Sequence, residues 1–349
     1  MIHYAFRDLE FIRTPEDMFF CVVGDKHPED RAISYLRYVP SSSDSLNLDR
    51  KQFKRTMPNY TIPHLLNNIS YLKKTYPEYV FHSDVFNIEM SAVPHYRVAQ
   101  HYKPQDKMKQ LSEIKDPDIL QKRTLEIAAY LADTLGISVE EFGVTGSILI
   151  DVHSTKFSDI DLTISGRENG FKLKKTLPIL FAEKREPVNY VPENVLQQLF
   201  ADRVKEFPLS LDEVKTLNKR QWNYGVFKGT IFSLHPIRLE SEIVGHYGDQ
   251  IFRPLGMVTG RAVISDISES LFNPHIYKVE SFINNEGLKS DEIQEIVTYS
   301  GLYGGIFEEG DEVNVYGKLE HVEDNAKGAT YQRVLVGSLE AGGHDYIKL

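Results

Sequence analysis

The order of hydrophobic and polar residues predicts a mixture of strands and helices over the first 105 residues. The segment "MFFCVVGDKHPEDRAISYLRYVP", Met18 to Pro40, predicts two strands on either side of a turn rich in charged residues. In "IPHLLNNISYLKKTYP" the hydrophobic residues Leu65, Ile69 and Leu72 recur three or four positions apart, which is the spacing of a helix. The "YVFHS" that follows predicts another strand, so we expect residues 1–105 to form a mixed α/β region.

The middle of the chain is dominated by helical spacing. "DPDILQKRTLEIAAYLADTLG" predicts a long helix that Asp116 caps, with Pro117 in the first turn and Gly136 at the exit. Two further helices are predicted in "GFKLKKTLPILFAEK" and "PENVLQQLFADRVKEFP". "VFKGTIFSLHPIRLE", Val226 to Glu240, predicts a strand in which Pro236 favours an edge or a bulge.

From about Met257 the chain consists of short β-rich runs separated by turns. They are "MVTGRAVISD", "HIYKVES", "EIVTYSGLY", "DEVNVYGKLEHVE" and "YQRVLVGSL". Five such strands predict a small β-barrel, and an OB-like barrel is the expected topology. We therefore expect an α+β protein with an N-terminal region at 1–105, a core at 106–250 and a barrel at 251–349.

Composition limits the class of protein more than it identifies a function. The 349 residues carry a net charge of -10, which argues against a protein that coats nucleic acid nonspecifically. Cys21 is the single cysteine, so an internal disulfide and a cysteine-rich zinc site are both excluded. The sequence has no secretion leader and no long apolar run, so we expect a cytoplasmic protein without membrane contact. The oligomeric state is left open.

One segment, "GVTGSILIDVHSTKFSDIDLTISG", combines features suited to an anionic ligand and a cation. A strand ends at Gly146, and Ser147 begins a short helix whose backbone N–H groups would face an anion such as a triphosphate. Asp159 and Asp161 lie two apart in the next predicted strand, so their side chains share one face. Neighbouring carboxylates repel one another unless a cation or basic groups lie beside them, and Mg²⁺ favours carboxylate and phosphate oxygens.

This Gly-Ser, spacer and Asp-x-Asp pattern resembles the nucleotidyltransferase superfamily that includes DNA polymerase beta. The whole chain also resembles an uncharacterised archaeal group that carries such a domain. The resemblance implies a polymerase-beta-like core, phosphate binding at Gly146 and Ser147, and Mg²⁺ or Mn²⁺ held by Asp159 and Asp161. It implies transfer of a nucleoside monophosphate from a nucleoside triphosphate to an acceptor hydroxyl, with release of pyrophosphate. RNA, a protein side chain and a small molecule all stay open as the acceptor.

The sequence departs from this family at a third carboxylate that usually comes from a later strand. "GTIFSLHPIRLE" has Ser233 and His235 where an acid is expected, and Glu240 and Glu242 follow only near or beyond its end. We therefore take Asp159 and Asp161 as the principal catalytic candidates, and Glu240 and His235 as candidates for the missing group. The alternative is a weakly active or inactive module that binds nucleotide, RNA or another protein.

Other residues near the motif have two interpretations each. Lys172 and Lys175 either contact the triphosphate or lie on a solvated helix face. Asp151 is expected to be solvated, with a metal ligand as the alternative, and His153 is expected to form a hydrogen bond at a helix end, with a place at the cleft mouth as the alternative. Trp222 suits either base stacking or packing.

Overall fold

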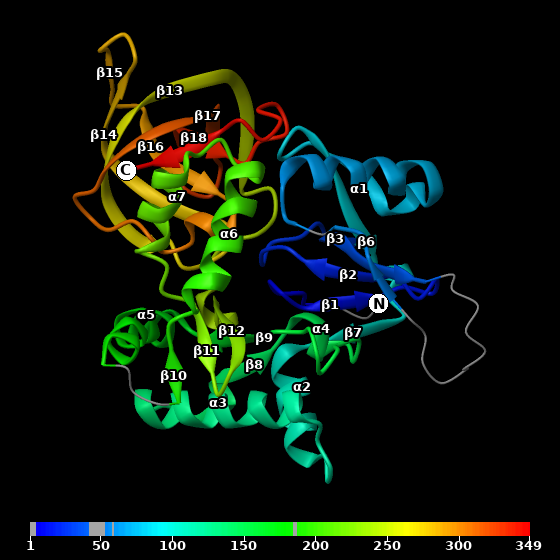
Figure 1. The fold of residues 1–349 in the computed structure, drawn as a ribbon. Coiled ribbons are helices and arrows are strands. Elements are labelled where there is room, and N and C mark those ends of the chain that lie inside the picture. Colours follow the sequence, from blue (N-terminus) through cyan, green and yellow to red (C-terminus); the bar gives the residue numbers. More distant parts are fainter. Residues whose placement is uncertain (1–4, 42–52, 58, 184–186) are drawn as a thin grey trace. The chain divides into compact units, whose positions relative to one another are not determined.

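The protein is an α+β structure, which agrees with the expected fold class (Figure 1). Its computed structural model describes residues 5–41, 53–57, 59–183 and 187–349. The chain divides into two compact units, and each unit is assembled from three separate stretches. The first unit comprises Met1–Pro58, Ser91–Val191 and Trp222–Val244, and the second comprises Asn59–Met90, Pro192–Gln221 and Gly245–Leu349.

The first unit begins with an N-terminal sheet in which the strand order is β6-β3-β2-β1-β7, with β4 paired to β3. Its strands are β1 (Phe11–Arg13), β2 (Phe19–Val22), β3 (Arg31–Pro40), β4 (Phe53–Arg55), β6 (Ile88–Pro94, in this unit from Ser91) and β7 (Gln100–Tyr102). The two strands predicted between Met18 and Pro40 are confirmed as β2 and β3. Every residue of β2 is buried, so this strand lies in the interior of the unit.

The second sheet of the first unit, here called the core sheet, has the order β10-β11-β12-β9-β8. Its strands are β8 (Phe142–Val144), β9 (Ile160–Ser165), β10 (Val188–Asn189), β11 (Tyr224–Phe227) and β12 (Thr230–Ile237). Strands β9 and β12 are parallel, whereas the other pairs are antiparallel. The strand predicted over Val226–Glu240 is confirmed from Thr230 to Ile237 as β12. The whole segment is not one strand, because Lys228 and Gly229 both adopt positive φ and turn the chain into a hairpin with β11.

The described residues of the first unit also form the helices α2 (Pro104–Glu113), α3 (Ile119–Leu135), α4 (Gly146–Leu149) and α5 (Arg167–Ala182). The long helix predicted from Asp116 begins later than expected. Asp118 is its cap, and its carboxylate accepts hydrogen bonds from the backbone N–H groups of Leu120 and Gln121. The exit at Gly136 is confirmed, since this glycine is left-handed with φ of 61°.

The N-terminal sheet packs on the short helix α4 of the core. Phe11, Cys21 and Tyr38 of β1, β2 and β3 form one buried hydrophobic cluster with Leu149 and Ile150. Figure 1 shows α4 between the N-terminal strands and the core sheet. Because α4 itself begins with Gly146 and Ser147, the N-terminal sheet packs next to the Gly-Ser segment.

The second unit contains two helical segments and a β-rich segment. Its helices are α1 (Ile62–Thr75), α6 (Glu193–Glu206) and α7 (Leu211–Asn218). The sequence predicted α1 and α6, whereas α7 was not predicted. Its strands are β5 (Val80–Ser83), β13 (Gln250–Glu269), β14 (His275–Asn284), β15 (Lys289–Ser290), β16 (Ile293–Thr298), β17 (Glu312–Asp324), β18 (Ala329–Val336) and β19 (Tyr346–Lys348). The large sheet has the order β13-β14-β16-β18-β17-β19, and β13 also pairs with β17. Phe200, Val214 and Leu217 of α6 and α7 share a hydrophobic core with this sheet.

The opposite face of the large sheet carries buried charges that pair with one another. Glu320 accepts a hydrogen bond from Arg333 at 2.8 Å and lies 2.9 Å from the ammonium of Lys318. The guanidinium of Arg333 lies 3.5 Å from the centre of the Phe252 ring. This network explains how three charged side chains remain in the interior of the second unit.

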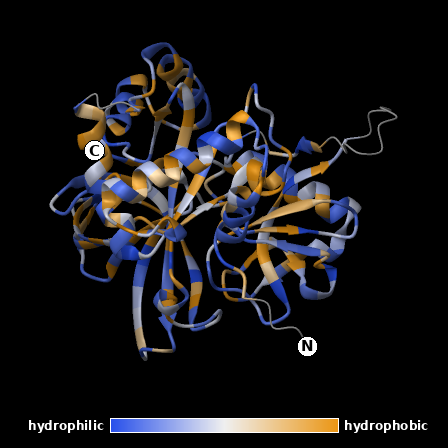
Figure 2. Ribbon diagram, turned by 90° about the horizontal axis from the view of Figure 1, so that it is seen from below, coloured by the Kyte–Doolittle hydropathy of each residue, from blue (hydrophilic) through white to orange (hydrophobic). Residues whose placement is uncertain are grey.

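Hydropathy along the ribbon follows the usual division between interior strands and exposed loops. Figure 2 shows hydrophobic residues concentrated in the strands and on parts of the helices, with hydrophilic residues frequent in the connections. Within the described ranges, each helix falls short of the length or the apolar character required to cross a lipid bilayer.

Candidate functional site

The candidate site begins at the turn between β8 and α4, where Gly146 meets Asp161. Gly146 has φ of +65°, and a Cβ added to it would lie 2.3 Å from Oδ2 of Asp161. The backbone N–H of Thr145 donates a hydrogen bond to the Asp161 carbonyl oxygen at 2.9 Å. The sequence motif is therefore one physical site, because the glycine turn and the second aspartate are in direct contact.

Asp159 and Asp161 lie at the start of β9, and strand alternation separates them from the core. Ile160, Leu162 and Ile164 are fully buried, whereas the Asp161 side chain retains 26% of its accessible surface. Asp159 immediately precedes the strand and is exposed. The hydrophobic residues between and after the carboxylates thus hold the strand in place and leave the acidic face open.

The two carboxyl groups have pKa values shifted in opposite directions. Displacement of water by the surrounding protein raises the pKa of Asp159 even though the side chain reaches the surface, and the negative charge of Asp161 raises it further. Burial also opposes ionisation of Asp161, but hydrogen bonding and charge from His235, the Ser233 hydroxyl and the charge of Arg37 outweigh it and lower that pKa. Asp161 is therefore the carboxylate that carries the negative charge more readily.

Ser233 occupies the position beside Asp161 on the neighbouring parallel strand. The β9–β12 register pairs Ser233 with Asp161, and the Ser233 hydroxyl donates a hydrogen bond to Oδ1 of Asp161 at 2.6 Å. Nε2 of His235 lies 2.8 Å from the same hydroxyl and 3.9 Å from Oδ1. A hydroxyl has one proton to give, so in this arrangement the Nε2–H of His235 donates to Ser233. Serine and histidine, not an acid, thus occupy the positions of β12 beside Asp161.

The acidic residues after β12 do not join this group. Glu240 and Glu242 lie in a short 3₁₀ helix, Glu240–Glu242, beyond the end of β12. The strand from Ser233 to Ile237 alone rises about 13 Å, and Glu240 lies three residues further on. The Glu242 carboxylate accepts hydrogen bonds from the backbone N–H groups of Arg167 and Leu239. Glu240 is therefore remote from the aspartates, and Glu242 stabilises the start of α5.

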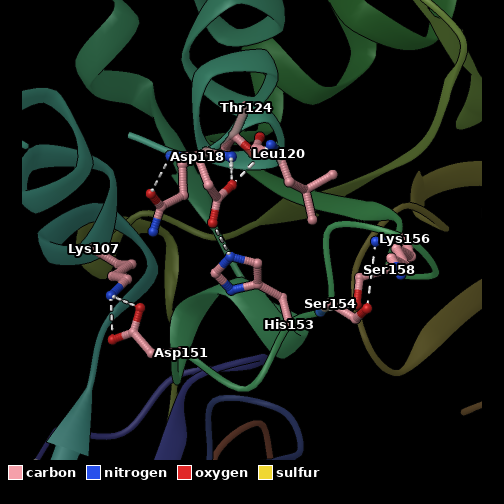
Figure 3. Close-up of polar contacts among 10 residues, drawn as sticks. Lys107, Asp118, Leu120, Thr124, Asp151, His153, Ser154, Lys156 and Ser158 are labelled. Atoms are coloured by element: carbon pink, nitrogen blue, oxygen red, sulfur yellow. Dashed lines mark hydrogen bonds and ion pairs between the residues drawn. The ribbon is translucent and has the colours of Figure 1, made fainter. Parts of the chain in front are cut away.

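The loop from α4 to β9 is attached to the core by one ion pair and one hydrogen bond (Figure 3). The ammonium of Lys107 on α2 lies 2.6 Å from both carboxylate oxygens of Asp151. Nε2 of His153 lies 2.8 Å from Oδ2 of Asp118, the cap of α3, so the helix-end hydrogen bond expected for His153 is present. Asp151 is exposed as expected. These pairs hold the chain on its path toward Asp159.

The remaining candidates from the sequence lie in varied environments. Ser147 is only 5% exposed, so its hydroxyl lies beneath the surface of the turn. Lys172 and Lys175 are exposed on α5, as expected for a solvated helix face. Trp222 is 3% exposed, which favours packing over base stacking.

Two arginines of the N-terminal sheet lie near the site, and sequence inspection did not single them out. Arg37 is 6% exposed, and its guanidinium donates a hydrogen bond to the Met57 carbonyl at 2.6 Å. The β2–β3 ladder pairs Phe19 with Tyr38 and Phe20 with Leu36, which leaves Arg37 as the extra residue of a β-bulge. Arg55, on β4, is exposed, and its positive charge partly offsets the raised pKa of Asp159. Neither residue belongs to a motif; tertiary packing alone brings them to the aspartates.

Asp159 and Asp161 suit a hard divalent cation for which a bound ligand supplies further oxygen donors. Asp161 lies on β9 and Asp159 directly precedes that strand, and the negative charge of Asp161 raises the pKa of Asp159. No group of three or more histidine, cysteine, aspartate or glutamate side chains suited to a metal occurs in the part of the chain that the structure describes. Mg²⁺ is commonly held by one or two carboxylates together with substrate phosphates, so this pair fits such an ion.

Comparison with known proteins finds similarity over nearly the whole chain. "Uncharacterized protein MJ1086" of Methanocaldococcus jannaschii is 28% identical over 345 residues, which cover 97% of this chain and 98% of that protein. No protein-family model matches the chain, and no solved structure matches it. The similarity extends far beyond the Gly-Ser and Asp-x-Asp segment and so includes both compact units.

Proposed function

We propose that the first unit is a divalent-cation-dependent nucleotidyltransferase with a polymerase-beta-like core. The contact between Gly146 and the Asp161 carboxylate carries this proposal, because it joins a phosphate-type turn to an acidic pair. In this proposal, a nucleoside triphosphate places its phosphates against Gly146 and Ser147. An acceptor hydroxyl, on RNA, a protein or a small molecule, attacks the α-phosphate, and pyrophosphate leaves.

The roles of the chain's own residues follow from their positions. Asp159 and Asp161 would hold Mg²⁺ or Mn²⁺, which when bound neutralises phosphate charge and activates the attacking oxygen. Ser233 orients the Asp161 carboxylate, and His235 lies within hydrogen-bond distance of Ser233 with part of its ring accessible. Because Nε2 donates its proton to Ser233, Nδ1 of His235 is the atom that would take the proton of the acceptor hydroxyl in this proposal. Rate enhancement in such a site would come mainly from positioning and charge neutralisation.

A second candidate function is a nucleotide-binding protein without transferase activity. It is favoured by the side chains beside Asp161, which are Ser233 and His235 instead of an acid. Two carboxylates and a phosphate chain suffice to bind a metal–nucleotide complex, whereas two-metal transfer usually uses more acidic ligands. The two functions share a ligand and differ only in turnover.

We further propose that the large sheet of the second unit is an OB-like barrel. The pairings β13–β14, β14–β16, β16–β18, β18–β17 and β17–β13 support it, since each of these five strands has a partner on both sides. Such barrels commonly bind nucleic acid or protein segments, which makes this unit the candidate for recognising the acceptor.

The decisive experiment separates binding from turnover. The full-length protein is incubated with each α-labelled nucleoside triphosphate, Mg²⁺ or Mn²⁺, and RNA, protein or small-molecule acceptors. Pyrophosphate release that disappears in Asp161→Asn is the expected result. Calorimetry with α,β-methylene triphosphates then tests the site without turnover. Binding that needs a divalent cation, without pyrophosphate release, selects the second candidate. Absence of both binding and release overturns both functions.

A further inference from the structure

We propose that the N-terminal sheet forms the cationic wall of this site, with Arg55 as the direct contact for the ligand's phosphates and Arg37 as the positioning residue behind it. This inference rests on the proposed nucleotide site. It assigns a binding role to residues far from the motif in sequence.

The need for such a wall follows from charge. A triphosphate placed beside Asp159 and Asp161 brings several negative charges to two carboxylates, within a chain whose net charge is -10. A divalent cation between carboxylates and phosphates neutralises only part of this charge, and arginine is well suited to the rest because its planar guanidinium binds phosphate oxygens in pairs. A cationic group supplied by the protein is therefore expected on the phosphate side.

Strand pairing places Arg55 on the face of the N-terminal sheet that meets the motif. Arg55 lies directly opposite Tyr38 in the antiparallel β3–β4 pair, so the two side chains share one face. The guanidinium carbon of Arg55 is 5.9 Å from the centre of the Tyr38 ring. Tyr38 is buried against Leu149 and Ile150, which follow the Gly-Ser turn by a few residues. Arg55 is itself exposed and so is accessible to a ligand.

Arg37 approaches the same tyrosine ring from within the sheet. The β-bulge redirects its side chain, and its guanidinium carbon lies 5.7 Å from the centre of the Tyr38 ring. The guanidinium is held beneath the surface by its hydrogen bond to the carbonyl of Met57. Met57 follows Arg55 by two residues in the chain. A buried arginine fixed in this way contributes positive potential without rearrangement when a ligand arrives.

Lys54 provides a matched control on the same strand. It is exposed and carries the same charge, but it lies opposite Val39 and so points to the other face of the sheet. Lys54→Gln and Arg55→Gln each remove one positive charge, and the two positions are adjacent in the chain. Only the second change removes charge from the face that packs on α4.

The test measures binding of α,β-methylene nucleoside triphosphates and the matching monophosphates to full-length protein by calorimetry in Mg²⁺. We expect Arg55→Gln to weaken triphosphate binding by about tenfold or more. Monophosphate binding should change less, and Lys54→Gln should bind like wild type. Equal affinities in Arg55→Gln and wild type, or equal losses in Arg55→Gln and Lys54→Gln, would overturn the inference and leave the nucleotide site standing. A wild-type protein that binds no triphosphate would instead refute the proposed function.

Arg37 is tested by two variants because it is buried. Arg37→Lys keeps the charge, and Arg37→Met removes it with similar bulk. We expect the lysine variant to retain more triphosphate affinity than the methionine variant while both keep the circular dichroism spectrum of wild type. Should Arg37→Met lose that spectrum, the Arg37→Lys affinity alone decides: binding equal to wild type or reduced severalfold supports a charge role, and complete loss with an intact fold contradicts it.

Discussion

Gly146 and Asp161 are in contact across the β8–α4 turn, where a Cβ on the glycine would lie 2.3 Å from the aspartate Oδ2. The same glycine has φ of +65°, a conformation that residues with a side chain adopt at a cost. Two independent constraints therefore require glycine at this position. One is local backbone geometry, and the other is the space that the acidic group occupies.

Gly146→Ala should disturb the site by more than its backbone strain. We expect the methyl group to displace the Asp161 carboxylate and to abolish binding of triphosphate in calorimetry. Gly136→Ala is the control, because Gly136 has a similar φ of +61° but no atom within 4 Å of an added Cβ. That control should lower the free energy of unfolding by about 1 kcal/mol and leave ligand binding intact. Normal binding by Gly146→Ala would show that the turn does not touch the ligand.

Ser233→Asp should add a third carboxylate to the site. The new side chain would lie beside Asp161, where the hydroxyl now donates at 2.6 Å. Without metal, the added repulsion should lower the melting temperature, and Mg²⁺ or Mn²⁺ should restore it because the ion screens the carboxylates. Ser233→Asn has a similar shape without the charge and should respond to metal like wild type. Indistinguishable metal responses in the Asp and Asn variants would argue against a cation at Asp161.

Stability should fall on acidification because of His27, which lies in the connection between β2 and β3. Burial lowers the pKa of His27 to about 4, and its Nδ1 accepts a hydrogen bond from the Ile33 backbone N–H at 3.1 Å. The unfolded chain therefore binds this proton first, so stability is lost as pH falls from about 6.5 toward 4, by about 3 kcal/mol at most. Above pH 6.5 the residue contributes no pH dependence.

His27→Asn isolates this contribution, because the asparagine carbonyl can accept the Ile33 hydrogen bond in place of Nδ1. The free energy of unfolding is measured by urea denaturation at pH 7.5, 6 and 5, and hydrogen exchange of the β2 and β3 amides is measured at the same pH values. The stability of the variant should depend less on pH than that of wild type. His82→Asn replaces an exposed histidine and should keep the wild-type profile. A wild-type slope in His27→Asn would place the acid sensitivity elsewhere.

Asp118→Ala should destabilise the protein more than Asp116→Ala. Asp118 caps α3 through two backbone N–H groups and also binds His153 of the loop before Asp159. Loss of the cap alone should cost about 1 kcal/mol in the free energy of unfolding, and loss of the His153 contact should add to it. Asp116 is exposed and precedes the helix, so its replacement should change stability little. Equal effects in chemical denaturation would contradict this assignment of the cap.

The sequence alone determined the secondary structure wherever a pattern was long and regular. The spacing of Leu65, Ile69 and Leu72 predicted α1, the β-rich runs after Met257 predicted β13, β14, β16, β17 and β18, and Gly136 marked the end of α3. The Gly-Ser turn and the two aspartates were also visible, because their geometry depends on short-range spacing within one turn and one strand. Local periodicity and local chirality decide these features, and both are written in neighbouring residues.

Tertiary structure alone decided which distant groups share the site. The β9–β12 register put Ser233 beside Asp161 and carried Glu240 past the end of the sheet. A bulge in β3 and the pairing of Arg55 with Tyr38 turned two arginines of the N-terminal sheet toward the motif. Register, bulges and sheet packing arise from contacts between separate segments of the chain, and a one-residue shift in any of them would present a different side chain.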